Sequence, residues 1–250
     1  MKIAVCIKRV PDTETRIRIA ADGVSVDETG VKFILNPYDE FAVEEALQRR
    51  DKAGAGEVVV VAVGPEAAQE TIRAALAMGA DRGVLLKADA VPADSLAVAK
   101  ALAAGLKDGA YDLILFGKVA VDDTAQAVGP MTAELLGLPC VTAVTKLEIE
   151  GGTGTAHREI EGGVEVVTFA LPVALTSEKG LNTPRYPALK GIMAAKKKPI
   201  EVRPVTFAAP RLRVAALELP SARKEGRIVG EGVDAVPELV RLLREEAKVL

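Results

Sequence analysis

Two kinds of segment alternate along the first 140 residues. Short runs are apolar at nearly every position, which is typical of strands buried on both faces of a parallel sheet. Longer segments between them carry apolar residues three or four positions apart, as helices do when they cover such a sheet. The predicted strands span residues 3–7, 57–63, 83–86, 111–117 and a run starting at 138; the predicted helices span 38–50, about 67–78, 94–106 and a stretch beginning within 122–137.

The pattern changes twice outside this region. Residues 16–35 contain short extended pieces separated by glycine turns, and after residue 145 the apolar positions recur with period two around a Gly-Gly turn. Period two with glycine turns indicates antiparallel hairpins. The apolar run 171–176 predicts one more buried strand, and a final amphipathic helix is expected at about 236–248.

Repeated strand–helix units with short connections predict a doubly wound α/β fold with a mostly parallel, Rossmann-like sheet, an added antiparallel hairpin and a C-terminal arm. We expect residues 1–200 to form the nucleotide-binding α/β domain. The tail 201–250 has too little apolar content for a core of its own, so it is expected to pack on this domain or on a partner.

Composition narrows the function classes. The net charge is −3, tryptophan is absent and aromatic residues make up 3% of the chain, so neither a positive field nor stacking platforms favour nucleic acid binding. We find no signal peptide and no apolar run of the ~20 residues that a membrane span needs. Cys6 and Cys140 lie far apart in apolar runs without metal-ligand spacing, which predicts buried, reduced thiols in a cytoplasmic protein and no metal site.

The segment after the predicted strand 111–117 is the best candidate for binding an anion. Gly117 ends that strand, and the next helix starts with N–H groups that lack partners, where a phosphate is favoured. Lys118 could add charge, whereas Asp122 and Asp123 could simply cap the helix, so an ordinary junction stays an equal alternative. Cys6, residues 36–39 and Gly64 follow other strands and are expected on the same edge.

No catalytic constellation is evident. Neither the dinucleotide fingerprint nor the Walker loop occurs. His157 is the only histidine and is interpreted as an exposed strand residue. The adjacent acids Glu44 and Glu45, like Glu245 and Glu246, are interpreted as solvated helix faces.

Residues 181–198 break the surrounding pattern. Two prolines exclude a central strand here, because proline cannot donate to the sheet ladder. The segment carries Leu189 with Ile192 and Met193 close by, followed by Lys196, Lys197 and Lys198. Exposed apolar residues rimmed by charge indicate a partner-docking loop, and a mobile, solubilising loop is the alternative.

These segments together resemble the β subunit of electron transfer flavoprotein over nearly the whole chain. The motifs that carry the resemblance are IKRVPD at Ile7, NPYDEFAVEEAL at Asn36, ETIRAALAMGADR at Glu70, DLILFGK at Asp112, GPMTAELLG at Gly129 and LNTPRYPALKGIMAAKKK at Leu181. Each motif is weak alone, but their combination is specific.

The resemblance implies an electron carrier without catalysis of its own, and a heterodimer with a larger α subunit, on which the C-terminal arm would pack. The α subunit would hold most of a redox-active FAD, and this chain a structural AMP. Electrons would pass from acyl-CoA and related dehydrogenases, as in fatty acid β-oxidation, to the flavin and on to a membrane quinone oxidoreductase.

The implied residues fall into two groups. The partner-binding residues would be Arg185, Tyr186, Leu189, Ile192, Met193, Lys196, Lys197 and Lys198, with Leu189 as anchor. The AMP contacts would be Cys6, Asn36, Pro37, Tyr38, Asp39, Val63, Gly117, Lys118, Val119, Ala120, Val121, Asp122, Asp123, Thr124, Ala125, Gln126, Ala127 and Val128.

The chain departs from the family pattern in the loop after Gly117. Val119, Thr124 and residues 125–128 replace polar side chains common in the family, so backbone amides would carry more of the phosphate binding. Two alternatives stay open: a bifurcating flavoprotein with a second FAD in this site, and a nucleotide-binding module without redox function.

Overall fold

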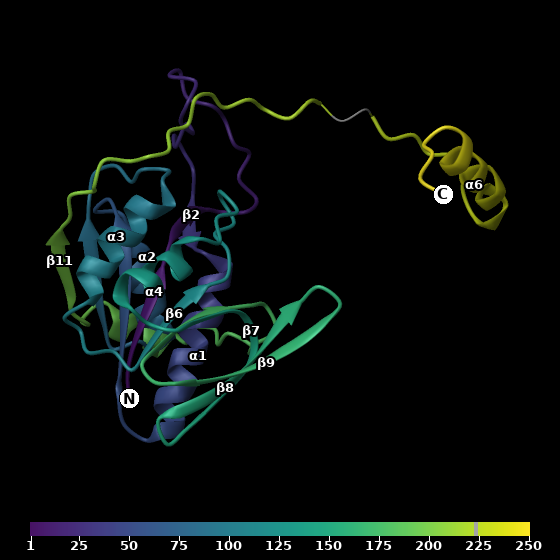
Figure 1. The fold of residues 1–250 in the computed structure, drawn as a ribbon. Coiled ribbons are helices and arrows are strands. Elements are labelled where there is room, and N and C mark those ends of the chain that lie inside the picture. The colour runs from purple at the N-terminus through teal and green to yellow at the C-terminus, as the bar shows by residue number, and fades with distance from the viewer. Residues whose placement is uncertain (223–224) are drawn as a thin grey trace.

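The computed structural model describes residues 1–222 and 225–250, and its centre is a sheet of nine strands (Figure 1). The strand order is β11-β5-β4-β1-β6-β10-β7-β8-β9. These strands are β1 (Lys2–Ile7), β4 (Glu57–Gly64), β5 (Arg82–Lys87), β6 (Leu113–Gly117), β7 (Cys140–Glu150), β8 (Thr153–Ile160), β9 (Gly163–Ala170), β10 (Val173–Ser177) and β11 (Ile200–Pro204).

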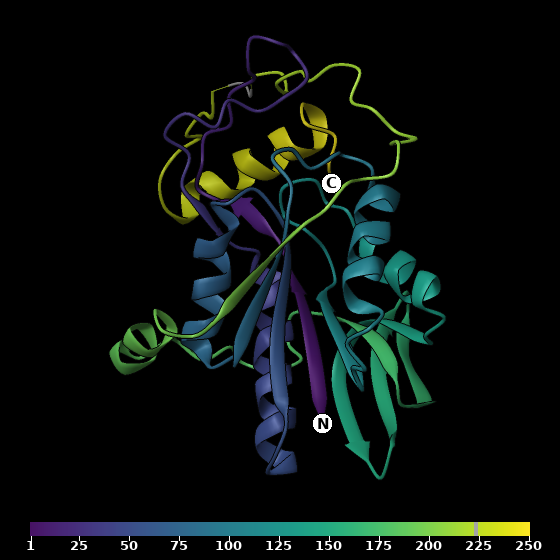
Figure 2. The same cartoon turned by 90° about the vertical axis from the view of Figure 1, so that its left-hand side faces the viewer.

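Helices cover both faces of the sheet, as the continuous apolar strands predict (Figure 2). One core cluster joins the sheet to α1 (Pro37–Ala53) and α2 (Ala68–Met78). The other joins it to α3 (Ser95–Leu106) and α4 (Val128–Leu136). The prediction of a doubly wound, mostly parallel α/β fold is therefore confirmed.

The chain reverses direction across the sheet at β1. It runs from β1 outward through β4 to β5, then returns by way of α3 to β6, which pairs with the other side of β1. Helices therefore leave the ends of β1 and β6 toward opposite faces. In such sheets the crevice beyond the carboxyl ends at this switch point is where ligands bind.

A single long strand, β7, belongs both to the parallel sheet and to the antiparallel addition. β7 pairs in parallel with β10 at its start and antiparallel with β8 over its second half, while β9 forms the outer edge. Within residues 16–35 only β3 (Phe33–Leu35) is a strand. It pairs with β2 (Arg9–Pro11) in a small antiparallel sheet.

The predicted boundary at residue 200 does not coincide with the end of the sheet, since β11 pairs in parallel with β5. The following segment is held on the domain by hydrogen bonds from its backbone. Arg211 N and Leu212 N donate to Asp94 Oδ2, and Leu217 N donates to Gly23 O over 2.8 Å. The first part of the tail, up to Leu217, therefore belongs to the α/β domain.

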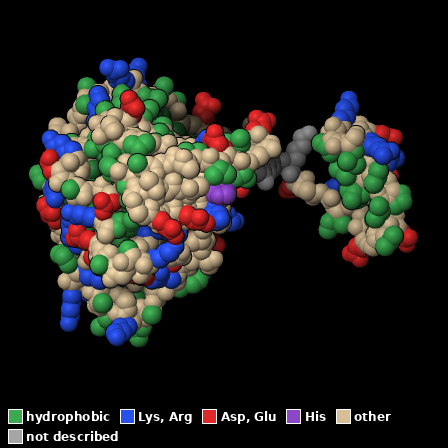
Figure 3. Space-filling model, turned by 60° about the horizontal axis from the view of Figure 1, so that its bottom comes forward, with side chains coloured by type: hydrophobic (Ala, Val, Ile, Leu, Met, Phe, Trp, Pro, Cys, Tyr) green, Lys and Arg blue, Asp and Glu red, His purple; other side chains and the backbone are tan. Residues whose placement is uncertain are grey.

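The end of the tail stands away from the body (Figure 1). A 3-10 turn, η1 (Val233–Ala235), leads into α6 (Val236–Glu245), which ends three residues before the expected position. No side chain of α6 is buried, and apolar side chains gather along it in Figure 3. A helix with an uncovered apolar stripe fits a partner surface, so packing of this arm on another subunit stays a prediction.

The two cysteines differ in environment. Cys6 is buried in β1, and burial raises the pKa of its thiol, whereas Cys140 at the start of β7 is exposed, so the prediction of a buried thiol there is wrong. Both are free of disulfides. Within residues 1–222 and 225–250, no helix has the length and apolar character to cross a membrane.

Candidate functional site

Four adjacent strands end at the same edge of the sheet. Cys6 in β1 lies opposite Phe116 in β6, and Ser177 in β10 lies opposite Gly117. The parallel register therefore brings the end of β1, the start of α1 and the loop after β6 together, as the sequence predicted. Val63, near the end of β4, lies on the other side of β1.

Asp39 ties the start of α1 to the ends of β1 and β6. Its Oδ2 accepts the backbone N–H of Lys8 over 2.6 Å, and its Oδ1 accepts that of Gly117 over 3.1 Å. Asn36 Nδ2 donates to the same Oδ1 over 2.9 Å. Three donors on one buried carboxyl group fix the relative position of three chain segments.

Burial raises the pKa of Asp39 to about 7, against the three N–H donors, which lower it. In the unfolded chain the group titrates near its ordinary value of 3.8. The folded state therefore holds the proton more tightly between these two pH values, and the stability from this group falls as pH rises through that window.

We expect the stability advantage of the wild type over Asp39→Asn to narrow between about pH 4 and pH 7 and to stay level above pH 7. Asparagine does not titrate, so it provides the reference. Its side-chain NH2 group would face one of the N–H donors whose hydrogen bonds Asp39 accepts. Denaturant unfolding at several pH values measures the difference. An advantage that grows with pH would show that the three donors outweigh burial.

Asn36 also holds the loop that follows β6. Its Nδ2 donates to Val119 O over 3.0 Å, and its Oδ1 accepts Val121 N over 3.2 Å. Ala120 N donates to Ala125 O over 3.1 Å, which closes the loop into a turn. The backbone of this loop is therefore anchored on the first residues of α1.

Lys8, which follows β1, forms ion pairs with the same loop. Its Nζ lies 2.8 Å from Asp122 Oδ1 and 2.8 Å from Asp123 Oδ2. Asp123 Oδ1 in turn accepts Ala125 N over 2.9 Å. The two acids therefore stabilise the loop. Neither caps α4, which begins later, at Val128.

The lysines of this edge are neutralised by neighbouring acids. Lys118 pairs with the buried Glu178, and Lys8 is shared by Asp122 and Asp123. Two ammonium groups thus face three carboxylates. A phosphate bound here would have to be held mainly by backbone N–H groups, unless these ion pairs rearrange.

The start of α4 offers such groups. The amides of Val128 and Gly129 lie in the first turn and so have no intrahelical acceptor. The N-cap residue, Ala127, makes no side-chain hydrogen bond to them. The turn packs closely on the strand ends, because a Cβ on Gly129 would lie 3.0 Å from Thr176 Cγ2. The buried Ser177 Oγ nearby also finds no protein partner among the described residues. Unpaired donors at a switch point fit a nucleotide phosphate.

The other predicted contact residues vary in accessibility. Cys6, Asn36 and Asp39 are buried beneath the edge and can act only through its shape or through their neighbours. The residues that reach the surface are half-buried or exposed: Pro37, Tyr38, Val63, Gly117, Lys118, Val119, Ala120, Val121, Asp122, Asp123, Thr124, Ala125, Gln126, Ala127 and Val128.

The segment 181–198 forms a second candidate site, which contains a short helix that the sequence did not predict, α5 (Leu189–Ala195). Tyr186 is 97% exposed and Leu189 is 77% exposed, and Ile192 and Met193 are exposed beside them. Four uncovered apolar side chains on one short segment are typical of a docking surface. We call residues 186–195 the docking segment.

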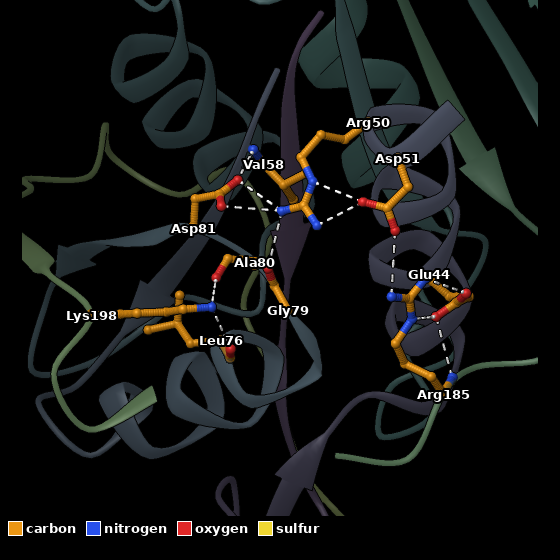
Figure 4. Close-up of polar contacts among 10 residues, drawn as sticks. All are labelled: Glu44, Arg50, Asp51, Val58, Leu76, Gly79, Ala80, Asp81, Arg185 and Lys198. Atoms are coloured by element: carbon orange, nitrogen blue, oxygen red, sulfur yellow. Dashed lines mark hydrogen bonds and ion pairs between the residues drawn. The ribbon is translucent and has the colours of Figure 1, made fainter. Parts of the chain in front are cut away.

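The three lysines after α5 do not act alike. Lys196 and Lys197 are exposed, whereas Lys198 Nζ turns inward and donates to the carbonyl oxygens of Leu76 and Ala80 at the end of α2 (Figure 4). The expectation of a triplet facing a partner is therefore revised for Lys198, which caps a helix C-terminus.

Two interpretations of charged residues are wrong. Glu44 is 4% exposed and Glu45 is 1% exposed, so they are not a solvated face. Although burial raises the pKa of Glu44, hydrogen bonds from Arg185 and Gln48 hold it below its usual value. His157 is half-buried on β8 rather than exposed.

Several residues that contact the two candidate sites could not be recognised from their residue type. Glu44 and Glu45 look like surface acids because adjacent charged residues on a helix are usually solvated, and Glu178 pairs with Lys118 across 60 residues. Lys8 carried one signal, its place at the end of a strand. Across the described chain, no three His, Cys, Asp or Glu side chains gather as metal ligands.

Known proteins are similar over the full length. The family described as "Electron transfer flavoprotein domain" matches residues 23–208. Three proteins named electron transfer flavoprotein subunit beta are similar over 100% of this chain: that of Bacillus subtilis is 43% identical over its whole length, that of Homo sapiens 39% identical over 99% of its length, and the one named mitochondrial in Oryza sativa 40% identical over its whole length. The chain therefore belongs to the family of electron transfer flavoprotein β subunits.

Proposed function

We propose that this chain is the β subunit of a heterodimeric electron transfer flavoprotein, which binds a structural AMP and carries no bond-breaking catalysis. The observation that supports nucleotide binding most directly is the set of uncapped amides at the start of α4, next to an edge whose lysines are already paired. A phosphate there would accept the free N–H groups and gain from the helix dipole, by ~0.3–1 kcal/mol when exposed.

The remaining contacts follow from the same edge. Asn36 and Asp39 would hold the loop in place rather than touch the nucleotide, and the apolar side chain of Val63 would lie beside the base. The FAD would be held mainly by the α subunit, and it supplies the electron-accepting chemistry when bound. The exposed apolar stripe of α6 would pack on that subunit.

The docking segment would bind acyl-CoA and related dehydrogenases transiently. Leu189 would enter an apolar pocket on the dehydrogenase, and Lys196 and Lys197 would steer acidic surfaces toward it. Electrons would then pass through the flavin to a quinone oxidoreductase. The subunit would reside in the cytoplasm, and it would neither bind nucleic acid nor insert into a membrane.

Mass spectrometry of the ligands released from the denatured heterodimer tests the proposal. One AMP and one FAD for each heterodimer is the expected result. Two FAD molecules would instead identify a bifurcating flavoprotein with a flavin in this site. A stable complex that releases no flavin would point to a nucleotide-binding module without redox function.

A further inference from the structure

The docking segment is fastened on both sides to neighbouring helices of the domain (Figure 4). Before it, Asn182 and Arg185 contact α1, and after it, Lys198 contacts α2. Its own four apolar side chains remain uncovered. The segment is thus exposed where it could meet a partner and held where it joins the fold.

The first anchor is a buried carboxylate. Glu44 accepts hydrogen bonds from Arg185 Nε over 2.7 Å, from Arg185 Nη2 over 3.0 Å and from the backbone N–H of Arg185 over 3.2 Å. Beside it, Asn182 Nδ2 donates to Phe41 O over 3.0 Å and to Glu45 Oε2 over 3.1 Å. Fork-like geometry on a desolvated acid fixes direction as well as position.

Ion pairs extend this anchor into the domain. Arg185 Nη1 lies 3.5 Å from Asp51 Oδ2. Arg50 bridges Asp51 to Asp81, and its Nη1 lies 3.1 Å from Asp81 Oδ2. Asp81 Oδ2 also accepts Val58 N over 2.7 Å. The chain of charges in Figure 4 therefore links the docking segment to the starts of β4 and β5.

The second anchor is reciprocal. Lys198 donates to carbonyl groups of α2, and Arg73 in α2 donates to the carbonyl groups of Ala195 and Lys198. Gly191 packs on the backbone of α2, since a Cβ there would lie 2.6 Å from Ala77 O. α5 can therefore not turn without breaking these contacts.

We propose that Glu44 is a positioning residue for docking: by holding Arg185, it presents residues 186–195 in one conformation before a dehydrogenase arrives. The inference rests on the proposed docking function. A segment ordered in advance loses less conformational entropy on binding, so its anchor contributes to affinity without touching the partner. At 4% exposure, Glu44 is out of a partner's reach.

The test uses Glu44→Gln in the purified heterodimer. We expect the KM of the dehydrogenase for the heterodimer to rise on the order of tenfold, because affinity is lost and electron transfer after docking is not. The kcat and the flavin content should stay within about twofold of wild type. Amide hydrogen exchange over residues 186–195 should become faster. Unchanged exchange there overturns the inference, whatever KM does.

Arg185→Met provides the second arm, with Arg203→Met as matched control. Arg203 grips Glu201 with the same two nitrogens, over 2.7 and 2.8 Å, and its side chain is 43% exposed against 40% for Arg185. Only the Arg185 variant should raise KM and speed exchange. Equal effects of the two would mean that loss of surface charge, and not anchoring, is responsible.

Combination with Leu189→Ala separates positioning from direct contact. If Glu44 acts by presenting Leu189, the leucine substitution costs several-fold less in KM in the Glu44→Gln background than in the wild type. Additive effects would overturn the inference. If Leu189→Ala alone leaves KM unchanged, the docking function fails, while the exchange data still decide whether Glu44 orders the segment.

Glu44→Gln removes the nearer carboxylate of Arg185 and leaves it only Asp51, at 3.5 Å. A second variant therefore has to show that any effect does not come from poor folding. The double variant Glu44→Gln/Arg185→Met removes both charges and avoids an unpaired one. It should show the same KM and exchange effects at normal heterodimer yield. Normal exchange in a folded double variant contradicts the proposal.

Discussion

Gly117→Ala is expected to abolish retention of AMP and to lower the free energy of unfolding by about 1–3 kcal/mol, the usual cost of overpacking. A Cβ at this position would lie 2.3 Å from Asp39 Oδ1 and 2.8 Å from the carbonyl carbon of Tyr38. Neither neighbour can yield, because Asp39 is held by three hydrogen bonds and Tyr38 belongs to the backbone of α1. The strand end, the helix start and the loop would therefore separate.

Denaturant unfolding and the AMP content of the purified heterodimer measure the two effects. Gly163→Ala is the matched control: it lies at the start of β9, and a Cβ there meets nothing within 4 Å. Full AMP content in a stable Gly117→Ala variant would mean that the junction at Asp39 does not shape the nucleotide site.

Leu189→Ala is expected to raise the KM of the dehydrogenase for the heterodimer about 30-fold, which corresponds to about 2 kcal/mol for the loss of a central anchor. Stability should not change, because the side chain is 77% exposed and contributes little to the core. Steady-state kinetics of the dehydrogenase with limiting and saturating heterodimer separate KM from kcat.

Leu135→Ala, at an exposed leucine of α4, controls for the loss of surface apolar area. It should leave KM within about twofold of the wild type. A Leu189→Ala variant with the KM of the wild type would remove the docking segment from the list of partner surfaces, and so would an equal effect of both substitutions.

The architecture was predictable because its signals are local. Runs such as that in β4 are buried on both faces, and such runs alternate with helical stripes, which leaves few arrangements other than a doubly wound sheet. Gly117 and Asn36 could be placed on one edge for the same reason, since parallel strands all end on the same side.

Charged residues were predicted least well. Glu44 and Lys198 lie on a helix and in a lysine run, where solvation is the usual outcome, yet both are turned inward by partners far along the chain. Cys140 shows the converse, because an apolar neighbourhood in the sequence does not ensure cover in space. Burial of a polar group depends on which distant donors or acceptors meet it.

By itself the sequence predicted the alternation of strands and helices, the edge of the sheet that brings Cys6, Asn36 and Gly117 together, and the apolar character of the segment around Leu189. Only the tertiary structure decided that Lys8 and Lys118 are already paired, that α5 forms, and that Glu44 and Lys198 hold the docking segment at both ends. The physical reason is range: hydrophobic periodicity acts between neighbours in the chain, whereas ion pairs and helix caps join residues that only folding brings together.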